Sequence, residues 1–210
     1  MAGFETLKEA RGKLMRAAAA LNARNVHGRG LPPIILMTDD TRVVDWVEAV
    51  GALPAGCAVV VRHRDAHARE ALARRLSGVC SARRVKLLIA DDPSLAVRIR
   101  ADGVHLPQRR ASQIAAIKTL NRHWLVTAAA HDERSARAAA RLGADAVLVA
   151  PVFRTASHPG GEALGVVRLA AISGKLRSAA YALGGVNEET IQSIADVPLC
   201  GVALIGGWTG

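Results

Sequence analysis

Charged side chains stand directly after several short apolar runs of this chain. Arg62 and Arg64 follow AVVV, Asp91 follows LLIA, and Arg109 and Arg110 follow GVHLPQ. Guanidinium groups hold phosphate oxygens with paired hydrogen bonds, and carboxylates are the ligands that Mg²⁺ prefers. These residues therefore predict chemistry on a phosphorylated ligand, with Asp91 as a metal-ligand candidate and Arg110 as a candidate contact to the anion.

Two glycine pairs follow two further apolar runs near the end of the chain. Gly184 and Gly185 follow AAYAL, and Gly206 and Gly207 follow GVALI. Glycine lets backbone N–H groups approach a ligand, and a helix predicted after Asn187 would add partial positive charge. We interpret the two pairs as a phosphate-binding site; tight turns without a ligand are the alternative.

Two other loops carry polar candidates. The loop at 151–161 contains Arg154, Thr155 and His158, which could close over an anion or form an exposed loop. His131 follows WLVTAAA and is a candidate general acid–base or a helix cap.

The composition limits the class of partner. The net charge is +10, with 23 arginines and 5 lysines, but one Tyr, two Phe and three Trp are too few to stack on nucleic-acid bases. We expect a small phosphorylated ligand; arginines on solvated helix faces are the alternative. Three well-separated cysteines indicate reduced thiols. No apolar run reaches the roughly 18–20 residues of a membrane helix, and the start of the chain carries acids, so we expect a cytoplasmic protein.

The spacing of apolar runs predicts the fold. Short runs typical of buried strands occupy 34–38, 58–62, 85–89, 103–106, 124–128, 146–150, 179–183 and 201–205. Between them lie segments typical of helices at 42–50, 67–78, 93–101, 111–121, 132–142, 165–176 and 188–195. Eight strands alternating with helices favour a compact α/β TIM (β/α)8 barrel, and an open doubly wound sheet is the alternative.

The domain prediction is one barrel domain over 1–210. Residues 1–30 form an N-terminal helix and linker, and the barrel spans 34–206. The last helix of a standard barrel is expected to be missing or truncated, and the extra N-terminal helix, at 5–24, is expected to cover that gap. A homo-oligomer is left open.

Several of these segments resemble the thiamine phosphate synthase family, which has a sister group with the same barrel, the thiazole tautomerases. DGVHLPQ is similar to the family's DGVHLGQ, and GADAVLVAPVFRTASH and ALGGVNEETI resemble its motifs around strands 6 and 7. The resemblance covers about 34–206. It implies a TIM barrel that joins hydroxymethylpyrimidine diphosphate to thiazole phosphate with Mg²⁺ and releases diphosphate.

The residues carried over from the family divide into two groups. Gly184, Gly185 and Thr155 keep the implied thiazole-phosphate site, and Arg62 keeps the arginine after strand 2, with Arg64 in a lysine place. The implied metal and diphosphate positions are altered, apart from the retained Asp91; Ala90, Arg110 and His158 stand where the family has Asn, Asp and Lys. Val60 replaces the glutamine that the family offers to the pyrimidine, and Pro107 replaces a glycine. Arg110 would repel a metal, or bind diphosphate directly and replace the charge of the ion.

Three functions follow from the resemblance. The first is thiamine phosphate synthesis. The second is tautomerisation of a thiazole phosphate, which needs no essential metal and would use His131 as general acid–base. The third is a non-catalytic relative that binds a phosphorylated ligand.

Overall fold

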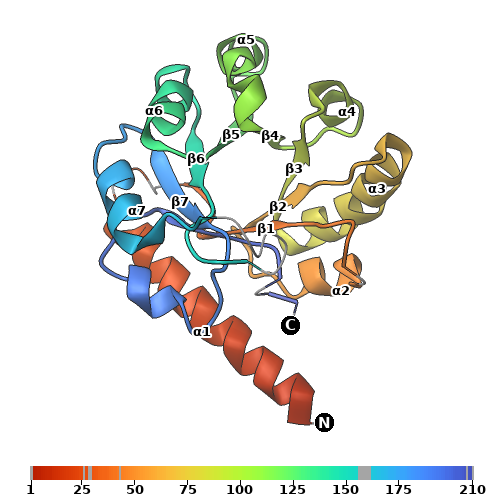
Figure 1. Ribbon diagram of the computed structural model, residues 1–210. Coiled ribbons are helices and arrows are strands. Elements are labelled where there is room, and N and C mark those ends of the chain that lie inside the picture. The colour runs from red at the N-terminus through yellow and green to blue at the C-terminus, as the bar shows by residue number, and fades with distance from the viewer. Residues whose placement is uncertain are drawn as a thin grey trace.

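The computed structural model describes residues 2–25 (2–5 by backbone alone), 27, 30–42, 44–155, 162–206 and 208–209. Eight parallel strands close into a barrel in chain order, and helices surround it (Figure 1). The strands are β1 (Ile34–Met37), β2 (Ala58–Val61), β3 (Lys86–Ala90), β4 (Gly103–Leu106), β5 (Leu125–Ala130), β6 (Ala146–Val149), β7 (Ala179–Leu183) and β8 (Gly201–Leu204). The predicted TIM barrel is confirmed.

Alternation along the strands divides the buried residues between two cores. Outward-facing residues such as Leu36 and Val104 pack under the helices. Inward-facing residues such as Met37 and Val60 fill the barrel. Because successive side chains point to opposite faces, residues two positions beyond these inward residues, Asp39 and Arg62, are aimed into the mouth of the barrel.

The helices follow the predicted order with shifted ends. They are α1 (Ala2–Arg24), α2 (Trp46–Gly51), α3 (Ala66–Arg83), α4 (Pro93–Arg98), α5 (Ile114–Leu120), α6 (Glu133–Arg141) and α7 (Gly165–Ser173), with 3₁₀ turns η2 (Gln108–Gln113) and η3 (Ile191–Ile194). Asp132 caps α6 in a capping box, as predicted. Within the described ranges, no helix is both long and apolar enough to cross a bilayer.

The helix predicted at 188–195 is wrong. The Asn187 side chain accepts hydrogen bonds from the amides of Glu189 and Thr190, and the Thr190 hydroxyl donates to the Gly185 carbonyl. These bonds wind the chain into tight turns that end in the short 3₁₀ helix η3. The glycines after β7 are therefore not followed by an α-helix that could add its dipole.

The N-terminal helix α1 packs along β8, as predicted (Figure 1). Its inner face buries Leu14 and Leu21. Asn22 donates to the Cys200 carbonyl at 2.8 Å, and Arg11 donates to the Trp208 carbonyl at 2.9 Å. The indole of Trp208 donates in turn to Ala49 of α2, so α1 and α2 hold the segment after β8 from both sides.

Candidate active site

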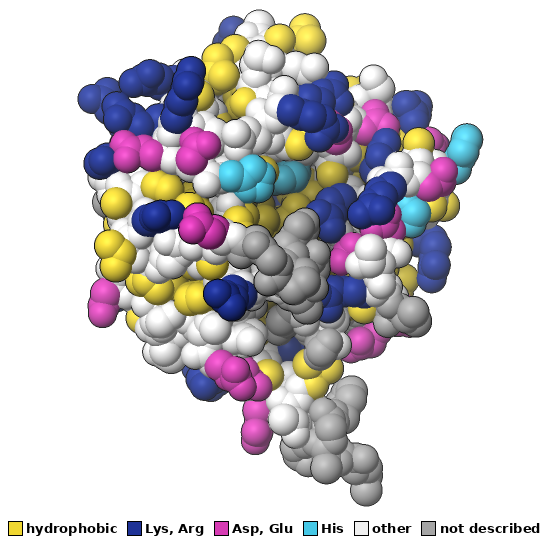
Figure 2. Space-filling model, viewed as in Figure 1, with side chains coloured by type: hydrophobic (Ala, Val, Ile, Leu, Met, Phe, Trp, Pro, Cys, Tyr) yellow, Lys and Arg dark blue, Asp and Glu magenta, His cyan; other side chains and the backbone are white. Residues whose placement is uncertain are grey.

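The carboxyl ends of the strands surround one open cavity of about 2030 Å³. Its floor is largely apolar, with Met37, Ala90, Leu183 and Ala203 from four strands and Ala150 directly after β6. Charged side chains form its rim, and histidine side chains lie beside the apolar hollow (Figure 2). In TIM barrels this face carries the functional loops, and the volume exceeds what one small ligand needs.

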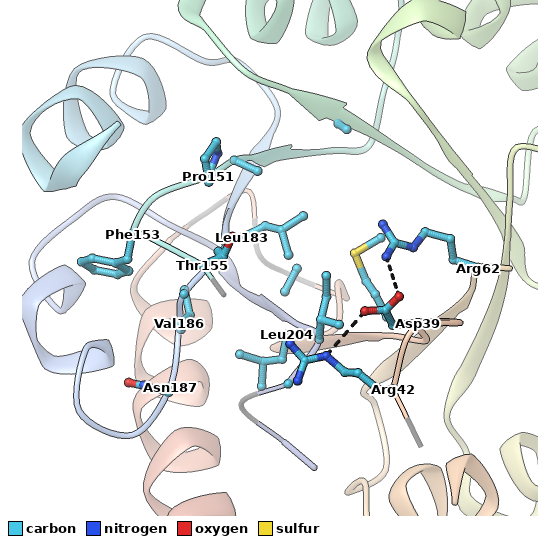
Figure 3. A pocket seen from close by; sticks show the side chains of 18 of the residues that line it. Asp39, Arg42, Arg62, Pro151, Phe153, Thr155, Leu183, Val186, Asn187 and Leu204 are labelled. Carbon is cyan, nitrogen blue, oxygen red and sulfur yellow. Dashed lines mark hydrogen bonds and ion pairs between the residues drawn. The ribbon is translucent and has the colours of Figure 1, made fainter. Parts of the chain in front are cut away.

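A buried aspartate joins two arginines on the β1–β2 side of the rim. Asp39 is only 5% exposed and lies between Arg62, at 3.3 Å, and Arg42, at 3.5 Å (Figure 3). Burial alone would raise the pKa of Asp39, but hydrogen bonds from Thr41 and the charges of Arg62 and Arg42 together lower it. Asp39 is therefore ionised and fixes both guanidinium groups toward the cavity.

Two neighbouring arginines engage Asp91 after β3. Arg109 contacts one carboxylate oxygen, and Arg110 contacts the other at 2.7 Å. Arg110 also donates to the Asp91 carbonyl at 2.7 Å and to Gln113. Arg109 lines the cavity and Arg110 does not, so the guanidinium of Arg110 is not placed for the predicted contact to an anion in the cavity.

The residues around Asp91 do not fit Mg²⁺. This ion requires several oxygen ligands in near-octahedral geometry, and carboxylates supply the protein's share. Both oxygens of Asp91 are paired with guanidinium groups, and across the described ranges no three Asp, Glu, His or Cys side chains are grouped to hold a metal. A cation at Asp91 would have to displace an arginine.

Arginines exceed carboxylates on this side of the rim. Six guanidinium groups pair with four carboxylates, an excess of two positive charges. The arginines are Arg42, Arg62, Arg64, Arg69, Arg109 and Arg110, and the acids are Asp39, Asp40, Asp91 and Asp92. The β1–β4 side of the rim therefore attracts an anion through side chains alone.

The opposite side of the cavity, after β6 and β7, is built from backbone. Gly184 and Gly185 have φ values of +92° and +68°, which favour glycine. A Cβ on Gly185 would lie 2.6 Å from Phe153 Cβ and 2.7 Å from the Arg154 carbonyl oxygen. The loop after β6 also donates from Phe153 N–H to the Gly184 carbonyl. The packing of the loop after β6 therefore requires glycine at both positions.

The two glycine-rich exits lie side by side. β7 pairs with β8, and Gly184, Gly185 and Gly206 line the same cavity. In the part of the chain described, their N–H groups donate no backbone hydrogen bond. This arrangement can receive a phosphate on exposed amides. Gly207 lies outside the described residues.

Two further predicted contacts, Thr155 and Arg154, also line the cavity. Thr155 projects from the loop after β6 on the side of Val186 and Asn187 (Figure 3). His158 lies outside the described residues. Arg64 is on the rim but largely exposed, 3.8 Å from Asp40.

His131 lines the cavity and is not the cap of α6, because Asp132 is. Its Nδ1 lies 2.8 Å from the Ala150 carbonyl oxygen. A carbonyl only accepts, so Nδ1 carries the proton and Nε2 is left to accept or donate according to its charge. His131 therefore has the orientation that a proton-transfer role requires.

The sequence interpretation did not single out His105 as a site residue. Its ring lies in the barrel interior, where Nδ1 is 2.9 Å from the Thr127 hydroxyl. Burial, followed by the charge of Arg62, lowers the pKa of His105 to about 4, against a smaller raising effect of Asp91. The ring is neutral near pH 7. Strand alternation could have found it, because His105 faces inward like Ala90 on the adjacent strand.

Asp39 and Arg42 were also missed. Extending the alternation of β1 predicts that Asp39 points inward. The position of Arg42 depends on the conformation of the loop after β1, which cannot be predicted from the periodicity of the sequence. A Cβ on Gly206 would lie 2.7 Å from Arg42 Nη1, a contact between residues 164 positions apart in the chain.

Comparison with known proteins places the chain in a family. The sequence model described as thiamine monophosphate synthase matches residues 34–207. The thiamine-phosphate synthase of Marinobacter nauticus is 33% identical over 189 residues, which cover 85% of this chain and 83% of the relative. That of Methanosarcina barkeri is 30% identical over 147 residues, which cover 68% and 66%.

A solved structure shares the fold. The thiamine phosphate pyrophosphorylase from Pyrococcus furiosus superposes with a TM-score of 0.73 at 22% identity, covering 87% of this chain and 88% of that one. With the match of the family model over most of the barrel, the chain belongs to the thiamine monophosphate synthase family.

Proposed function

We propose that the cavity condenses hydroxymethylpyrimidine diphosphate with thiazole phosphate to give thiamine phosphate and diphosphate, in the cytoplasm. The observation that carries this is the placement of two anion-attracting surfaces on one cavity: arginines on the β1–β4 side and exposed amides on the β7–β8 side. Two phosphorylated substrates need two such surfaces, and family membership supports the identity of the reaction.

The reaction makes a particular demand on the site. The bond between the pyrimidine methylene carbon and the diphosphate oxygen breaks, and the diphosphate keeps the electron pair. The thiazole nitrogen then donates its lone pair to that carbon. No proton moves in these steps, so the protein must neutralise the leaving diphosphate and align the partners.

We propose that Arg62, Arg64 and Arg109 receive the diphosphate. Arg62 and Arg109 line the cavity beside carboxylates that orient them, and Arg64 extends the same rim. His105 beneath them is neutral, so in this proposal the arginines supply the positive charge. Because Asp91 is paired with two arginines, we propose that this neutralisation does not depend on Mg²⁺ held there.

The test is a product assay with both substrates, in EDTA and over a range of Mg²⁺ concentrations. We expect thiamine phosphate in every condition, and a loss of about 10–100-fold in Arg109→Gln, the effect of removing a charge-assisted hydrogen bond. Absence of product at every Mg²⁺ concentration would exclude the synthase. Product only with Mg²⁺ would exclude neutralisation by arginine alone.

The orientation of His131 supports a second candidate function, isomerisation of a thiazole carboxylate phosphate with Nε2 as the proton carrier. This reaction needs the phosphate-binding side and no diphosphate contact. Incubating the protein with that substrate tests it; isomerisation that survives Arg109→Gln but not His131→Asn would support it.

A further inference from the structure

Arg42 occupies an unexpected place, across the exit of β8. Its guanidinium would touch a Cβ at Gly206: Nη1, Cζ and Nη2 lie 2.7, 2.9 and 3.1 Å from that position. Figure 3 shows the Arg42 side chain reaching from the loop after β1 to Leu204 of β8. A guanidinium thus lies directly against one of the glycines of the β7–β8 side.

The charge of Arg42 is only half compensated. Asp39 is shared with Arg62, so one carboxylate faces two guanidinium groups. The Nε of Arg42 is buried and makes no hydrogen bond to any described residue. Its side chain is 35% exposed, and within the described part of the chain no acceptor is bonded to Nη1 or Nη2. A buried or half-buried donor set of this kind calls for a partner.

We propose that Arg42 binds the phosphate monoester of the thiazole substrate, with Asp39 as its positioning residue. The Nη donors and the amides of Gly184, Gly185 and Gly206 face one phosphate from two sides. The identity of this ligand rests on the proposed function; the binding of a phosphate monoester by Arg42 does not.

Gly206 has a defined part in this arrangement. A Cβ there would meet the end of the Arg42 side chain, so the guanidinium would have to shift. We expect Gly206→Ala to weaken phosphate binding in the same direction as the loss of Arg42, while leaving the arginine in the sequence.

The experiment measures binding by calorimetry with the full chain. The probes are thiazole phosphate, the unphosphorylated thiazole alcohol and inorganic phosphate. We expect Arg42→Gln to weaken thiazole phosphate and inorganic phosphate by about 10–100-fold, the effect of losing a charge-assisted pair, without weakening the alcohol. The phosphate affinity of Arg42→Lys should lie between those of wild type and Arg42→Gln, because lysine keeps the positive charge but cannot donate two parallel hydrogen bonds.

Matched controls separate this from folding and from general charge effects. Arg75→Gln removes the same charge from an exposed position on α3 that has no ion pair in the described structure. It should bind like wild type, and circular dichroism should show all variants folded. If Arg42→Gln fails to fold, Arg42→Lys and Gly206→Ala carry the comparison.

The outcomes distinguish this inference from the proposed function. Phosphate-ligand affinity within twofold of wild type in both Arg42→Gln and Gly206→Ala would overturn the role of Arg42, whatever the activity. Arg42-dependent phosphate binding in a protein that makes no thiamine phosphate would sustain this inference and remove the synthase assignment.

Discussion

The two sides of the cavity meet anions in different ways. The β1–β4 side uses guanidinium groups, each tied to a carboxylate, and holds an excess of two positive charges. The β7–β8 side uses backbone amides exposed by glycines whose positive φ is fixed by the packing of the loop after β6. A change in a rim side chain leaves the backbone in place, whereas a surface made of backbone amides depends on the exact course of the chain.

This contrast has a consequence for altered sequences. Arg110 stands where the resemblance to the family motif implies an aspartate, and its guanidinium is held by bonds to Asp91 and Gln113. A side chain at Gly185 would meet the Phe153 Cβ and the Arg154 carbonyl oxygen at under 3 Å. We expect the backbone side to be the more sensitive of the two.

The largest effect should therefore come from Gly185→Ala. The new Cβ collides with the loop after β6 at an already left-handed φ, so we expect about 1–3 kcal/mol loss of stability and up to about 100-fold weaker binding of a phosphate ligand. Gly143→Ala is the control, since its φ is +94° with no atom within 4 Å of the new Cβ. Urea unfolding and calorimetry give both quantities; equal effects at the two positions would break the comparison.

The next effect tests the arginine side. Arg110→Asp should place a second carboxylate beside Asp91, so that two carboxylates could bind Mg²⁺. We expect Mg²⁺ to raise the melting temperature of Arg110→Asp but not that of wild type or of Arg110→Gln, which loses the charge without adding a ligand. Stabilisation of wild type by Mg²⁺ to the same degree would show that the pairing of Asp91 does not exclude the ion.

A pH effect should trace to His105, beneath the arginine side. Its pKa is about 4 when folded and 6.5 as an ordinary histidine, so the unfolded chain binds more protons between these values. Its contribution to stability is present above about pH 6.5 and falls, by roughly 3 kcal/mol, as the pH drops to about 4. Urea unfolding across this range should show a shallower decline in His105→Gln; identical slopes would mean that the ring is not neutral in the fold.

The smallest effect should come from His131→Asn. The amide can still donate to the Ala150 carbonyl, so the loop geometry is kept. Condensation moves no proton. We therefore expect synthase turnover to decrease by much less than the roughly 100-fold that removal of a general acid–base causes. A 100-fold decrease in thiamine phosphate formation would show that the reaction depends on proton transfer by His131 and not on charge neutralisation alone.

Much of the barrel could be predicted from the sequence, because buried parallel strands are short apolar runs with clear ends. The strands at 103–106 and 179–183 match β4 and β7 to the residue. The failure at 188–195 has a local cause: Asn187 and Thr190 bond to nearby backbone and compete with the helix.

The site was predictable only where strand alternation places a side chain. Arg62, His131, Gly184, Gly185 and Gly206 line the cavity because each follows a strand, although their roles there stay predictions. The sequence could not predict which of Arg109 and Arg110 lines the cavity. That depends on the turn of η2, which directs the Arg109 guanidinium to the cavity and the Arg110 guanidinium to Gln113. The place of Arg42 against Gly206 depends on contacts between the first and last strand loops, which no local pattern encodes.

The seam between α1 and β8 also shapes how this barrel can form. Arg11 and Trp208, which bond across it, are 197 positions apart, and Asn22 reaches 178 positions to Cys200. During synthesis α1 emerges first yet gains its partners last, so its apolar stripe of Leu14 and Leu21 must wait uncovered while seven strands assemble. Because these contacts are so far apart in the chain, we expect closure of the ring, rather than formation of the helix, to be the slower step in folding.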